Sequence, residues 1–358
     1  MKTGIDIMEM AAEIIRQNQT KADYIVDTRR LEMESYGTNV ALKMLDENGI
    51  DVIEPMNVNQ IAHNQIGTRL EIPAAYYNKM LTDDPGLLAY NVNKWFQREP
   101  KKRMIRTLDG SARAFLSNRY RRIDNHEILE AVFPILMKME GARFESCQIT
   151  DSRMYVKVVN TRLETEVTVG DVVQAGVIIS NSEVGHGSVC IQPLVMRLVC
   201  MNGMVVNDAA AKQNHLGRVQ TTGENYQLYS DKTLAAEDNA FLLKIEDTVK
   251  AAVDETRFNQ VIELMCEAAG AKVTARDISA VVKLARKDFG IQENEETGVL
   301  NQFILDRNFT LYGLSNAVTR YSQDVDCYDR ATELEKIGYD ILTMGRSRWN
   351  RLNNEASA

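Results

Sequence analysis

The order of apolar and polar positions divides the chain into a helical start, a strand-rich middle and a helical final third. Apolar residues at helical spacing over residues 5–22 and 32–48 predict two helices in an N-terminal arm. Residues 56–81 predict two further short helices. They are interrupted at Ile72-Pro73, because the residue before a proline disfavours helical backbone.

Alternating apolar and polar positions predict an antiparallel sheet over residues 90–210. Asp109-Gly110 and Asn202-Gly203 favour tight hairpin turns, since both residues of each pair tolerate positive φ. Residues 124–141 predict one helix that crosses the sheet. Beyond the first hairpin, the predicted strands are residues 142–149, 153–160, 172–180 and 187–200.

From about residue 230 the spacing becomes helical, over residues 232–254, 257–270, 275–289, 297–305 and 313–343. The sequence therefore predicts an α+β fold: a twisted antiparallel β-sheet crossed by a helix, followed by a mostly helical C-terminal region. We expect three parts. They are an N-terminal helical arm at residues 1–54, an α+β core with the hairpin at residues 55–228, and a helical C-terminal domain at residues 229–358.

Composition limits the class of protein. The chain has 358 residues, of which 44% are hydrophobic and 26% charged, as in an ordinary soluble protein. No apolar run is long enough to cross a membrane, and residues 1–20 lack the apolar core of a signal peptide. The five cysteines form no CxxC pair, which is typical of a reducing compartment. We expect a cytoplasmic protein without a membrane partner.

Positive charge is concentrated in residues 94–122, KWFQREPKKRMIRTLDGSARAFLSNRYRR. Ten basic residues stand there against two acidic ones, a net charge of +8 in a chain whose net charge is −8. So large a local excess is typical of a surface that binds a polyanion. The alternative is a solvated basic hairpin beside acidic parts of the same fold.

A turn at Asp109-Gly110 sets which residues face each other across the predicted hairpin. It places Arg106 opposite Arg113, and Met104 opposite Phe115, on one face. Two opposed arginines repel each other, and a phosphate bound between them would reverse that penalty. Phe115 would stack on a base or simply complete the hairpin. The residues expected on the core-facing side are Ile105, Ala114 and Leu116.

Three positions further along the chain extend the predicted surface. His186 lies between glycines in SNSEVGHGSVC, where it acts as a general base, contacts DNA or belongs to a bulged loop. Arg197 is a lone charge in an apolar strand and either pairs with a buried acid or points into the same groove. The predicted nucleic-acid-binding residues are Lys101, Lys102, Arg103, Arg106, Arg113, Phe115, Arg119, Tyr120, Arg121, Arg122, His186, Arg197, His215 and Arg218.

Sequence motifs for catalysis are missing: the chain has no GxSxG, no P-loop and no HExxH. The histidines and cysteines match no common zinc spacing. We therefore expect no catalytic residue, no metal and no cofactor. The acids that keep a metal-dependent nuclease open as an alternative are Asp124, Asp151, Asp171 and Glu183.

Five segments occur in the order typical of one known family: IPAAYYNKM, PGLLAYNVNKWF, RTLDGSARAFLSNRYRRIDNHEIL, SNSEVGHGSVCIQPLVMRLVCMNGMVV and GLSNAVTRYSQDV. Across residues 55–345 the chain therefore resembles a family of bacteriophage- and plasmid-borne proteins that carries a domain-of-unknown-function label. The resemblance implies a prophage or conjugative element in a bacterial host, and no established activity. In architecture the chain also resembles phage single-strand-annealing proteins of the Redβ and RecT kind, which assemble into rings or filaments on DNA. That likeness carries over no residue.

Together these observations favour a non-enzymatic, single-stranded DNA-binding protein of a phage or mobile element that promotes annealing and forms a homo-oligomer. Two alternatives remain. One is a metal-dependent nuclease that uses the same groove, and the other is a protein-interaction module that binds a host or phage protein.

Overall fold

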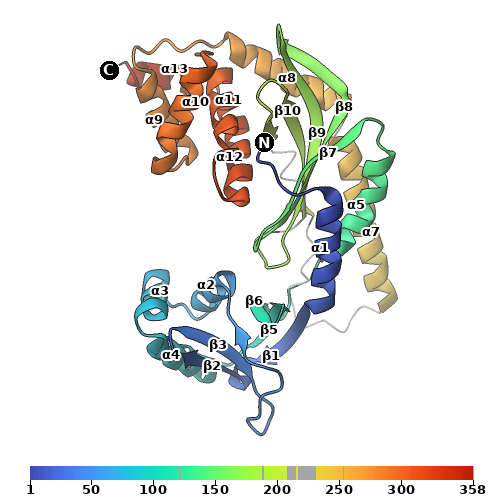
Figure 1. Cartoon of the computed structure of the whole chain (residues 1–358), viewed down its shortest axis with the longest axis vertical. Helices are drawn as coiled ribbons and strands as arrows, with labels where there is room; N and C mark the ends of the chain where they lie inside the picture. Colours follow the sequence, from blue (N-terminus) through green and yellow to red (C-terminus); the bar gives the residue numbers. More distant parts are fainter. Residues whose placement is uncertain (121, 188, 208–214, 217–230, 253, 358) are drawn as a thin grey trace.

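The chain forms an open crescent of three parts, as the computed structural model shows (Figure 1). An N-terminal unit of short strands and helices lies at one end, an antiparallel sheet with helices in the middle, and further helices at the other end. The predicted α+β class, with a mostly helical C-terminal region, is confirmed. The residues that the structure describes are 1–120, 122–187, 189–207, 215–216, 231–252 and 254–357.

The N-terminal unit packs helices against two small antiparallel sheets, with strand orders β2-β3-β4 and β1-β5-β6. Leu88, Val92 and Phe96 of the last helix are fully buried in the core that these elements share. The two predicted helices around Ile72-Pro73 are confirmed. The elements are β1 Ala22–Asp27, the short 3-10 helix η1 Thr28–Arg30, β2 Leu31–Tyr36, β3 Asn39–Met44, β4 Met56–Asn57, α2 Gln60–Arg69, α3 Ala74–Asp83, α4 Pro85–Arg98, β5 Lys102–Leu108 and β6 Ser111–Ser117.

Two predicted features of this unit are wrong. The helix expected over residues 32–48 is the β2–β3 pair, joined at Gly37, which has a φ of +60°. Three successive residues of β3 are buried, so the alternation that marks a strand is hidden in the sequence. The sheet expected from residue 90 starts later, because α4 continues to Arg98. The helical arm is thus restricted to α1, Ile7–Thr20.

Strands β5 and β6 form the predicted hairpin. Asp109 and Gly110 occupy the turn with φ values of 50° and 74°, and Leu108 faces Ser111 as expected. The strand pair is buried on both faces, so neither face is a solvent-exposed trough. The prediction of one exposed and one core-facing side is therefore wrong.

A β-bulge at Arg113 changes the register of the hairpin. It places Arg106 opposite Ala114 instead of Arg113, and it places Phe115 opposite Ile105. A shift of one residue moves side chains to the other face of a strand pair. Phe115 consequently joins the core of the N-terminal unit.

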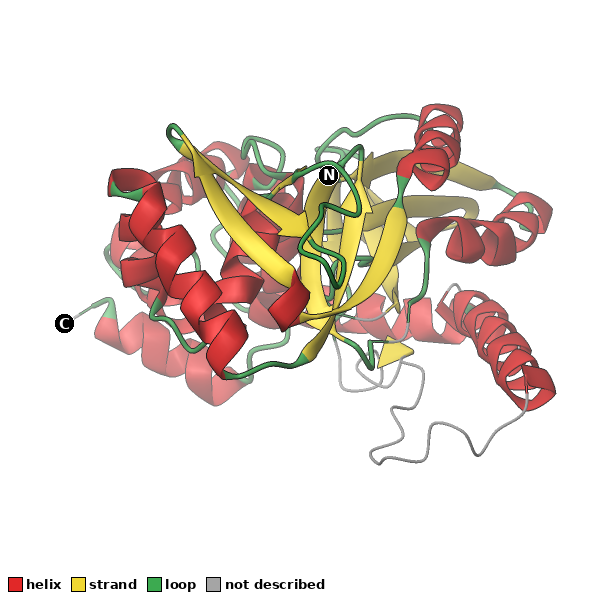
Figure 2. Ribbon diagram, turned by 90° about the horizontal axis from the view of Figure 1, so that it is seen from below, coloured by secondary structure: helices red, strands yellow, loops and turns green. Residues whose placement is uncertain are grey.

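The central sheet has the strand order β11-β10-β9-β8-β7, with β12 beside β10. Figure 2 shows the long strands, in yellow, with helices packed around them. Helices α1, α5 and α7 cover one of its faces. The four strands predicted after the helix are confirmed, although β8 is longer than expected. These elements are α5 Asn125–Lys138, β7 Ala142–Ile149, β8 Met154–Thr168, β9 Asp171–Asn181, β10 Val189–Arg197, β11 Asn202–Val205, β12 His215–Leu216 and α7 Asp231–Ala252.

The second predicted hairpin turn is displaced. Asn202 is already part of β11 and pairs with Arg197, so the turn occupies residues 198–201. Met201 supplies the positive φ, at 52°. Gly203 lies within the strand, close to Leu194.

The remaining helices pack on one another and on the second face of the sheet. The helix predicted over residues 313–343 is in fact two helices, separated at residues 322–327. None of the described helices has the length and apolar composition needed to cross a bilayer. These elements are α8 Glu255–Gly270, α9 Ile278–Phe289, the 3-10 helix η2 Glu293–Glu295, α10 Glu296–Asp306, α11 Leu311–Tyr321, α12 Tyr328–Leu342 and α13 Arg346–Glu355.

The path of the chain joins the N-terminal unit to the sheet at two neighbouring points. Met10 and Ile14 of α1 are buried with α5 against the sheet, whereas β1, the next element, belongs to the N-terminal unit. The chain returns to the sheet at α5. The chain leaves the sheet at Lys21 and returns at Asp124, and Lys21 Nζ lies 2.8 Å from Asp124 Oδ2.

The start of α11 requires a glycine at position 313. A Cβ there would lie 1.6 Å from the carbonyl oxygen of Asn308, which is backbone and has no rotamer to change. We expect Gly313→Ala to lower the free energy of unfolding by about 3 kcal/mol, the upper end of the usual cost of overpacking. Urea unfolding followed by circular dichroism measures this.

Gly270 is the matched control, because a Cβ at this exposed helical position meets nothing within 4 Å. Gly270→Ala should leave stability unchanged or slightly raised, since alanine favours the helix. Equal stability of both variants would contradict the packing at α11.

Candidate nucleic-acid interface

The basic residues of the 94–122 stretch separate into two groups with different surroundings. Arg106, Arg113 and Arg122 pair with carboxylates of the same chain. Those carboxylates come from parts of the sequence far from the stretch: Asp23 and Glu183. The cationic trough expected along the hairpin is therefore already neutralised by the protein at these three positions.

Arg106 is fully buried at the centre of the first group. Its Nε lies 2.7 Å from Asp23 Oδ1, its Nη2 2.6 Å from Asp124 Oδ1, and its Nη1 donates to the carbonyl of Glu183 at 2.8 Å. Burial alone would lower the pKa of Arg106, but Asp124 and Asp23 outweigh it and raise the pKa. This guanidinium joins three segments of the chain and does not face solvent.

Glu183 is the partner of Arg113. Its Oε2 lies 2.7 Å from Arg113 Nη2, and its Oε1 accepts a hydrogen bond from the backbone N–H of Asn125 at the start of α5. A carboxylate is favoured at a helix N-terminus by the exposed N–H groups and the helix dipole. Glu183, one of the four acids that kept a metal-dependent nuclease open, is thus a buried structural anion.

The two aromatic residues proposed for base stacking are also engaged within the fold. Phe115 is 1% exposed and stacks on Phe96, with 5.9 Å between ring centroids. Tyr120 is half-buried, and its hydroxyl donates to the carbonyl of Ser182 at 3.2 Å. Phe115 therefore has no face for a base in this conformation.

The second group of basic residues lies at the other end of the hairpin, where β5 begins. Lys101 and Lys102 are exposed and Arg103 is half-buried. Within the described chain, no carboxylate lies within ion-pairing distance of these three side chains. Lys102 does face Asp27 across the β1–β5 pair, and its charge helps to lower the pKa of that acid, after the larger effect of Arg29.

Arg103 shares a small pocket with a second arginine, Arg69, at the end of α2. The cationic pocket, of about 220 Å³, is lined by Thr28, Arg69, Leu70, Glu71, Trp95, Glu99, Lys101, Arg103 and Phe115. Arg69 is held in place because its Nε donates to the carbonyl of Phe115 at 3.0 Å. It too lacks a carboxylate within ion-pairing distance among the described residues.

The positive charges of the two arginines in the cationic pocket repel each other. Burial lowers the pKa of Arg69, and burial together with the charge of Arg69 lowers the pKa of Arg103. Two half-buried cations without an anion between them are an unfavourable arrangement. An anion in the pocket would relieve it.

The exposed face of α4 continues from this pocket. Tyr90 is 61% exposed and lies under Lys94, whose Nζ is 5.4 Å from the ring centroid. Arg98 lies over the ring of Trp95, also at 5.4 Å. We call these four side chains the α4 ridge. Basic and aromatic groups alternate along it.

Arg69 and the α4 ridge were missed as site residues from the sequence. Arg69 stands in a segment with few other basic residues, and it meets Arg103 only through the packing of α2 on β6. Trp95 and Lys94 stand inside the basic stretch but were expected to lead into a strand. The helical spacing of Tyr90, Lys94 and Arg98 was the signal that could have placed them on one face.

Other predicted site residues lie elsewhere. His186 is exposed in the β9–β10 loop, and Arg119 and Arg122 are exposed after the hairpin. Arg197 has its Nε 2.6 Å from Asp171 Oδ1 and its Nη1 3.4 Å from Asp306. Of the two alternatives for Arg197, the pairing with a buried acid is therefore the one that the structure shows. Arg121, Arg218 and the side chain of His215 lie outside the described residues.

In the part of the chain that the structure describes, no group of three or more His, Cys, Asp or Glu residues is arranged to hold a metal ion. The carboxylates beside Arg106 and Arg113 are ion-paired with these arginines.

Comparison with known proteins gives one match. No curated protein and no solved structure matches the chain. A family model matches residues 114–337, from the second strand of the hairpin to α12. Apart from Phe115, the residues of the cationic pocket precede this range. Since the match spans more than half of its length, the chain belongs to the family described as Domain of unknown function, DUF932.

Proposed function

We propose that this protein, carried by a phage or another mobile element, binds single-stranded DNA through the cationic pocket and the α4 ridge. The observation that carries the proposal is that Arg69 and Arg103 share one pocket with no carboxylate within ion-pairing distance of either among the described residues. The site differs from the trough expected from the sequence. It keeps Lys101 and Arg103 and does not include Lys102, Arg106 or Arg113. Phe115 stays only as part of the pocket wall and no longer as a stacking group.

The electrostatics of the cationic pocket favour a phosphate. Guanidinium groups bind phosphate oxygens with paired, charge-assisted hydrogen bonds. Here Arg69 is held by the carbonyl of Phe115 before any ligand binds, and Arg103 lines the same pocket, so less side-chain entropy is lost on binding than for two free arginines. The bound anion would also screen the repulsion between Arg69 and Arg103.

The α4 ridge favours a single strand over a duplex. Tyr90 presents an exposed ring and Trp95 lines the cationic pocket, each beside a cation. Bases stack on such rings with about 1–3 kcal/mol each, and only unpaired, splayed bases expose both faces for this. A phosphate in the pocket would place the neighbouring bases over α4.

We expect the double variant Arg69→Gln/Arg103→Gln to bind a dT oligonucleotide about 100-fold more weakly than the unmodified protein, because two charge-assisted contacts are lost. The slope of log K against log salt should become less negative by about 1.4, since two fewer counterions are released. Fluorescence anisotropy over a salt series measures both quantities.

Arg162→Gln is the matched control, because Arg162 is an exposed arginine on the central sheet, far from the pocket in the chain. It should leave the affinity and the slope unchanged. The proposal fails if the unmodified protein does not bind at low salt, or if the double variant binds equally well.

Tryptophan fluorescence of Trp349→Phe gives a second readout, because Trp95 is then the sole tryptophan and stacking should quench it.

Annealing extends the proposal, since bases stacked on α4 would keep their pairing edges accessible. Mixing two labelled complementary strands with the protein should speed their pairing. The same mixture with Mg²⁺ tests the nuclease alternative, which requires that the oligonucleotides be shortened. Light scattering of the DNA complex tests the homo-oligomer, and a stoichiometric protein partner recovered without DNA would favour the protein-interaction alternative.

A further inference from the structure

Strand β1 forms a free edge of the β1-β5-β6 sheet. The N–H of Thr28 donates to the carbonyl of Lys101 at 3.1 Å, in the same register in which β1 pairs with β5. Backbone groups alternate in direction along an antiparallel strand. The even-numbered residues of β1 therefore bond to β5, whereas the N–H and C=O groups of Asp23, Ile25 and Asp27 point outward. No hydrogen bond from the described residues reaches these outward groups.

The opposite edge of the same sheet, β6, is covered by the chain itself. The N–H of Asn59 donates to the carbonyl of Ala112 at 3.0 Å. At Phe115, Gln65 Oε1 accepts from the N–H at 2.7 Å and Arg69 Nε donates to the carbonyl at 3.0 Å. Proteins protect a sheet edge by such cover, or by a proline or a bulge. Strand β1 has neither a proline nor a bulge between its first and last residue.

A groove of about 500 Å³ runs along this edge. All of residues 23–27 line it, and it is flanked by Met44 of β3 and by Val52 of the loop that follows β3. Ile25 is 60% exposed and Val52 is 50% exposed. Lys102, which the cationic pocket does not include, lines the groove as well. Open backbone groups beside exposed apolar side chains form a site where a further strand can be added.

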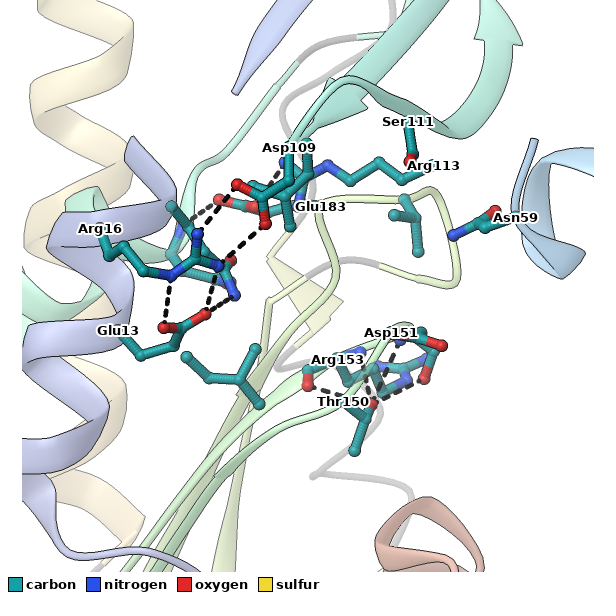
Figure 3. A pocket seen from close by; sticks show the side chains of 16 residues that line it. Glu13, Arg16, Asn59, Asp109, Ser111, Arg113, Thr150, Asp151, Arg153 and Glu183 are labelled. Carbon is teal, nitrogen blue, oxygen red and sulfur yellow. Dashed lines mark hydrogen bonds and ion pairs between the residues drawn. The ribbon is translucent and has the colours of Figure 1, made fainter. Parts of the chain in front are cut away.

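The β1 edge is held in place before any partner binds. Helix α1 ends at Thr20, just before β1, and Thr20 Oγ1 donates to Asp109 Oδ1 at 2.6 Å. Arg16 Nη1 lies 2.9 Å from the same oxygen, and Figure 3 shows this guanidinium pointing toward Asp109 and Glu13. The start of β1 is thus tied to the turn of the hairpin. A strand that is already fixed loses less entropy when it pairs with another.

The order of residues along β1 is self-complementary. From Asp23 to Asp27 the side chains are acid, apolar, apolar, apolar, acid, and the order is the same in both directions. In a two-fold antiparallel pair centred on a residue with outward N–H and C=O groups, the two copies of that residue face each other. Ile25 meets this condition. Ile25 would then face the second copy's Ile25, and Tyr24 would face Val26, an aromatic and β-branched pair of the kind that stabilises antiparallel strands.

The charges at the two ends of β1 are compatible with a second copy. In the two-fold pair Asp23 faces the second copy's Asp27. Each acid brings its own arginine: Arg122 Nη1 lies 2.7 Å from Asp23 Oδ2, and Arg29 Nη2 lies 3.0 Å from Asp27 Oδ2. Two acids and two arginines thus meet at each end of the pair, so that the facing carboxylates are compensated and do not oppose pairing as bare like charges would.

We propose that two copies of this chain form a dimer by antiparallel pairing of their β1 strands about Ile25. Two sheets of three strands become one sheet of six, in the order β6-β5-β1-β1-β5-β6. Arg103 lies on β5, opposite Val26 of β1, so this sheet joins the cationic pockets of the two copies. The dimer itself does not require that either pocket bind DNA.

Sedimentation of the full chain, free of nucleic acid, tests the proposal at concentrations up to about 1 mM, where weak dimers also form. We expect a monomer–dimer equilibrium, and dimerisation at least tenfold weaker for Ile25→Lys, because a lysine on a strand edge opposes pairing. Ile25→Pro should act in the same way, since it removes an outward N–H and leaves the hydrogen bonds to β5 intact. Urea unfolding verifies that each variant folds, and either folded variant decides the question.

Ile25→Cys tests the register. Facing residues of a hydrogen-bonded antiparallel pair have Cα atoms about 5.5 Å apart, which is within the range of a disulfide. Treatment with oxidised glutathione should therefore convert Ile25→Cys to a covalent dimer. Val169 is the matched control position, because it is an apolar residue that is 100% exposed on the β8–β9 turn. Val169→Lys should dimerise like the unmodified protein, and Val169→Cys should not be crosslinked beyond the level of the unmodified protein.

The proposal is overturned if the unmodified protein stays monomeric at the highest concentration, which would leave the β1 edge to a strand of another protein. It is also overturned if folded Ile25→Lys or Ile25→Pro dimerises as tightly as the unmodified protein, or if Ile25→Cys is crosslinked no more than Val169→Cys. The variant Arg69→Gln/Arg103→Gln should dimerise normally, so that a failure of single-strand binding and a failure of the dimer are distinguished.

Discussion

Replacing Lys157 by methionine is expected to lower the free energy of unfolding by about 3–5 kcal/mol, because it leaves the carboxylate of Glu335 buried without its cation. Both side chains are 0% exposed, and Lys157 Nζ lies 2.7 Å from Glu335 Oε2. The ammonium also lies 4.7 Å from the ring centroid of Tyr328. The pair joins β8 of the central sheet to α12 of the C-terminal helices.

Urea unfolding measures this effect, and two variants make the result specific. Arg162→Met removes a cation from a pair with Glu140 in which both side chains are mostly exposed, and it should change stability very little. The double variant Lys157→Met/Glu335→Leu should recover much of the loss, since no charge then remains buried. If Lys157→Met were as stable as the unmodified protein, β8 and α12 would not be joined by this ion pair.

Arg106→Met should have a comparable effect, a loss of about 3–5 kcal/mol at neutral pH, because Asp23 and Asp124 would lose their shared buried partner. Arg122→Met is the matched control. Arg122 pairs with the same Asp23, but its side chain is 53% exposed, so its loss should matter much less. Unfolding in urea at pH 7 compares the two.

The same variant should also change the response to acid. Burial acts to raise the pKa of Asp124, but Arg106 and Lys21 outweigh it and lower the pKa to about 2. A carboxyl whose pKa is lower in the folded state contributes stability above its unfolded pKa, and loses that contribution as pH falls from about 4 to about 2. Without Arg106, the pKa of Asp124 should rise and this acid-sensitive contribution should shrink. An unchanged stability profile between pH 4 and pH 2 would contradict the assignment.

The fold was predictable from the sequence where a pattern of apolar and polar residues is compatible with one type of element only. The strands of the central sheet consist of alternating or consecutive apolar residues between clear turn residues, and Asp109-Gly110 predicted the hairpin turn. Residues 32–48 were misread because β3 is buried on successive residues, which resembles a helix over so short a segment. The bulge at Arg113 has no local sequence signal, since it is stabilised by contacts with Glu183, 70 residues away in the chain.

The candidate site was only partly predictable for a related reason. Charge counting located the basic stretch correctly, but it cannot tell which cations have partners. The carboxylates that neutralise Arg106 come from β1 and from the start of α5, and only the folded chain brings them together. Arg69 meets Arg103 in the same way, through the packing of α2. Net charge over a window is therefore an upper limit on the charge that a ligand encounters.

The N-terminal unit is, in topology, an insertion within the domain built on the central sheet. The chain enters it after Lys21 and leaves it before Asp124, and those two side chains are 2.8 Å apart. The family match begins at residue 114, close to the exit. If related genes exchanged this unit, the two junctions, at Lys21 and Asp124, would already lie in contact. The cationic pocket would then be gained or lost without a change in the arrangement of the sheet and its helices.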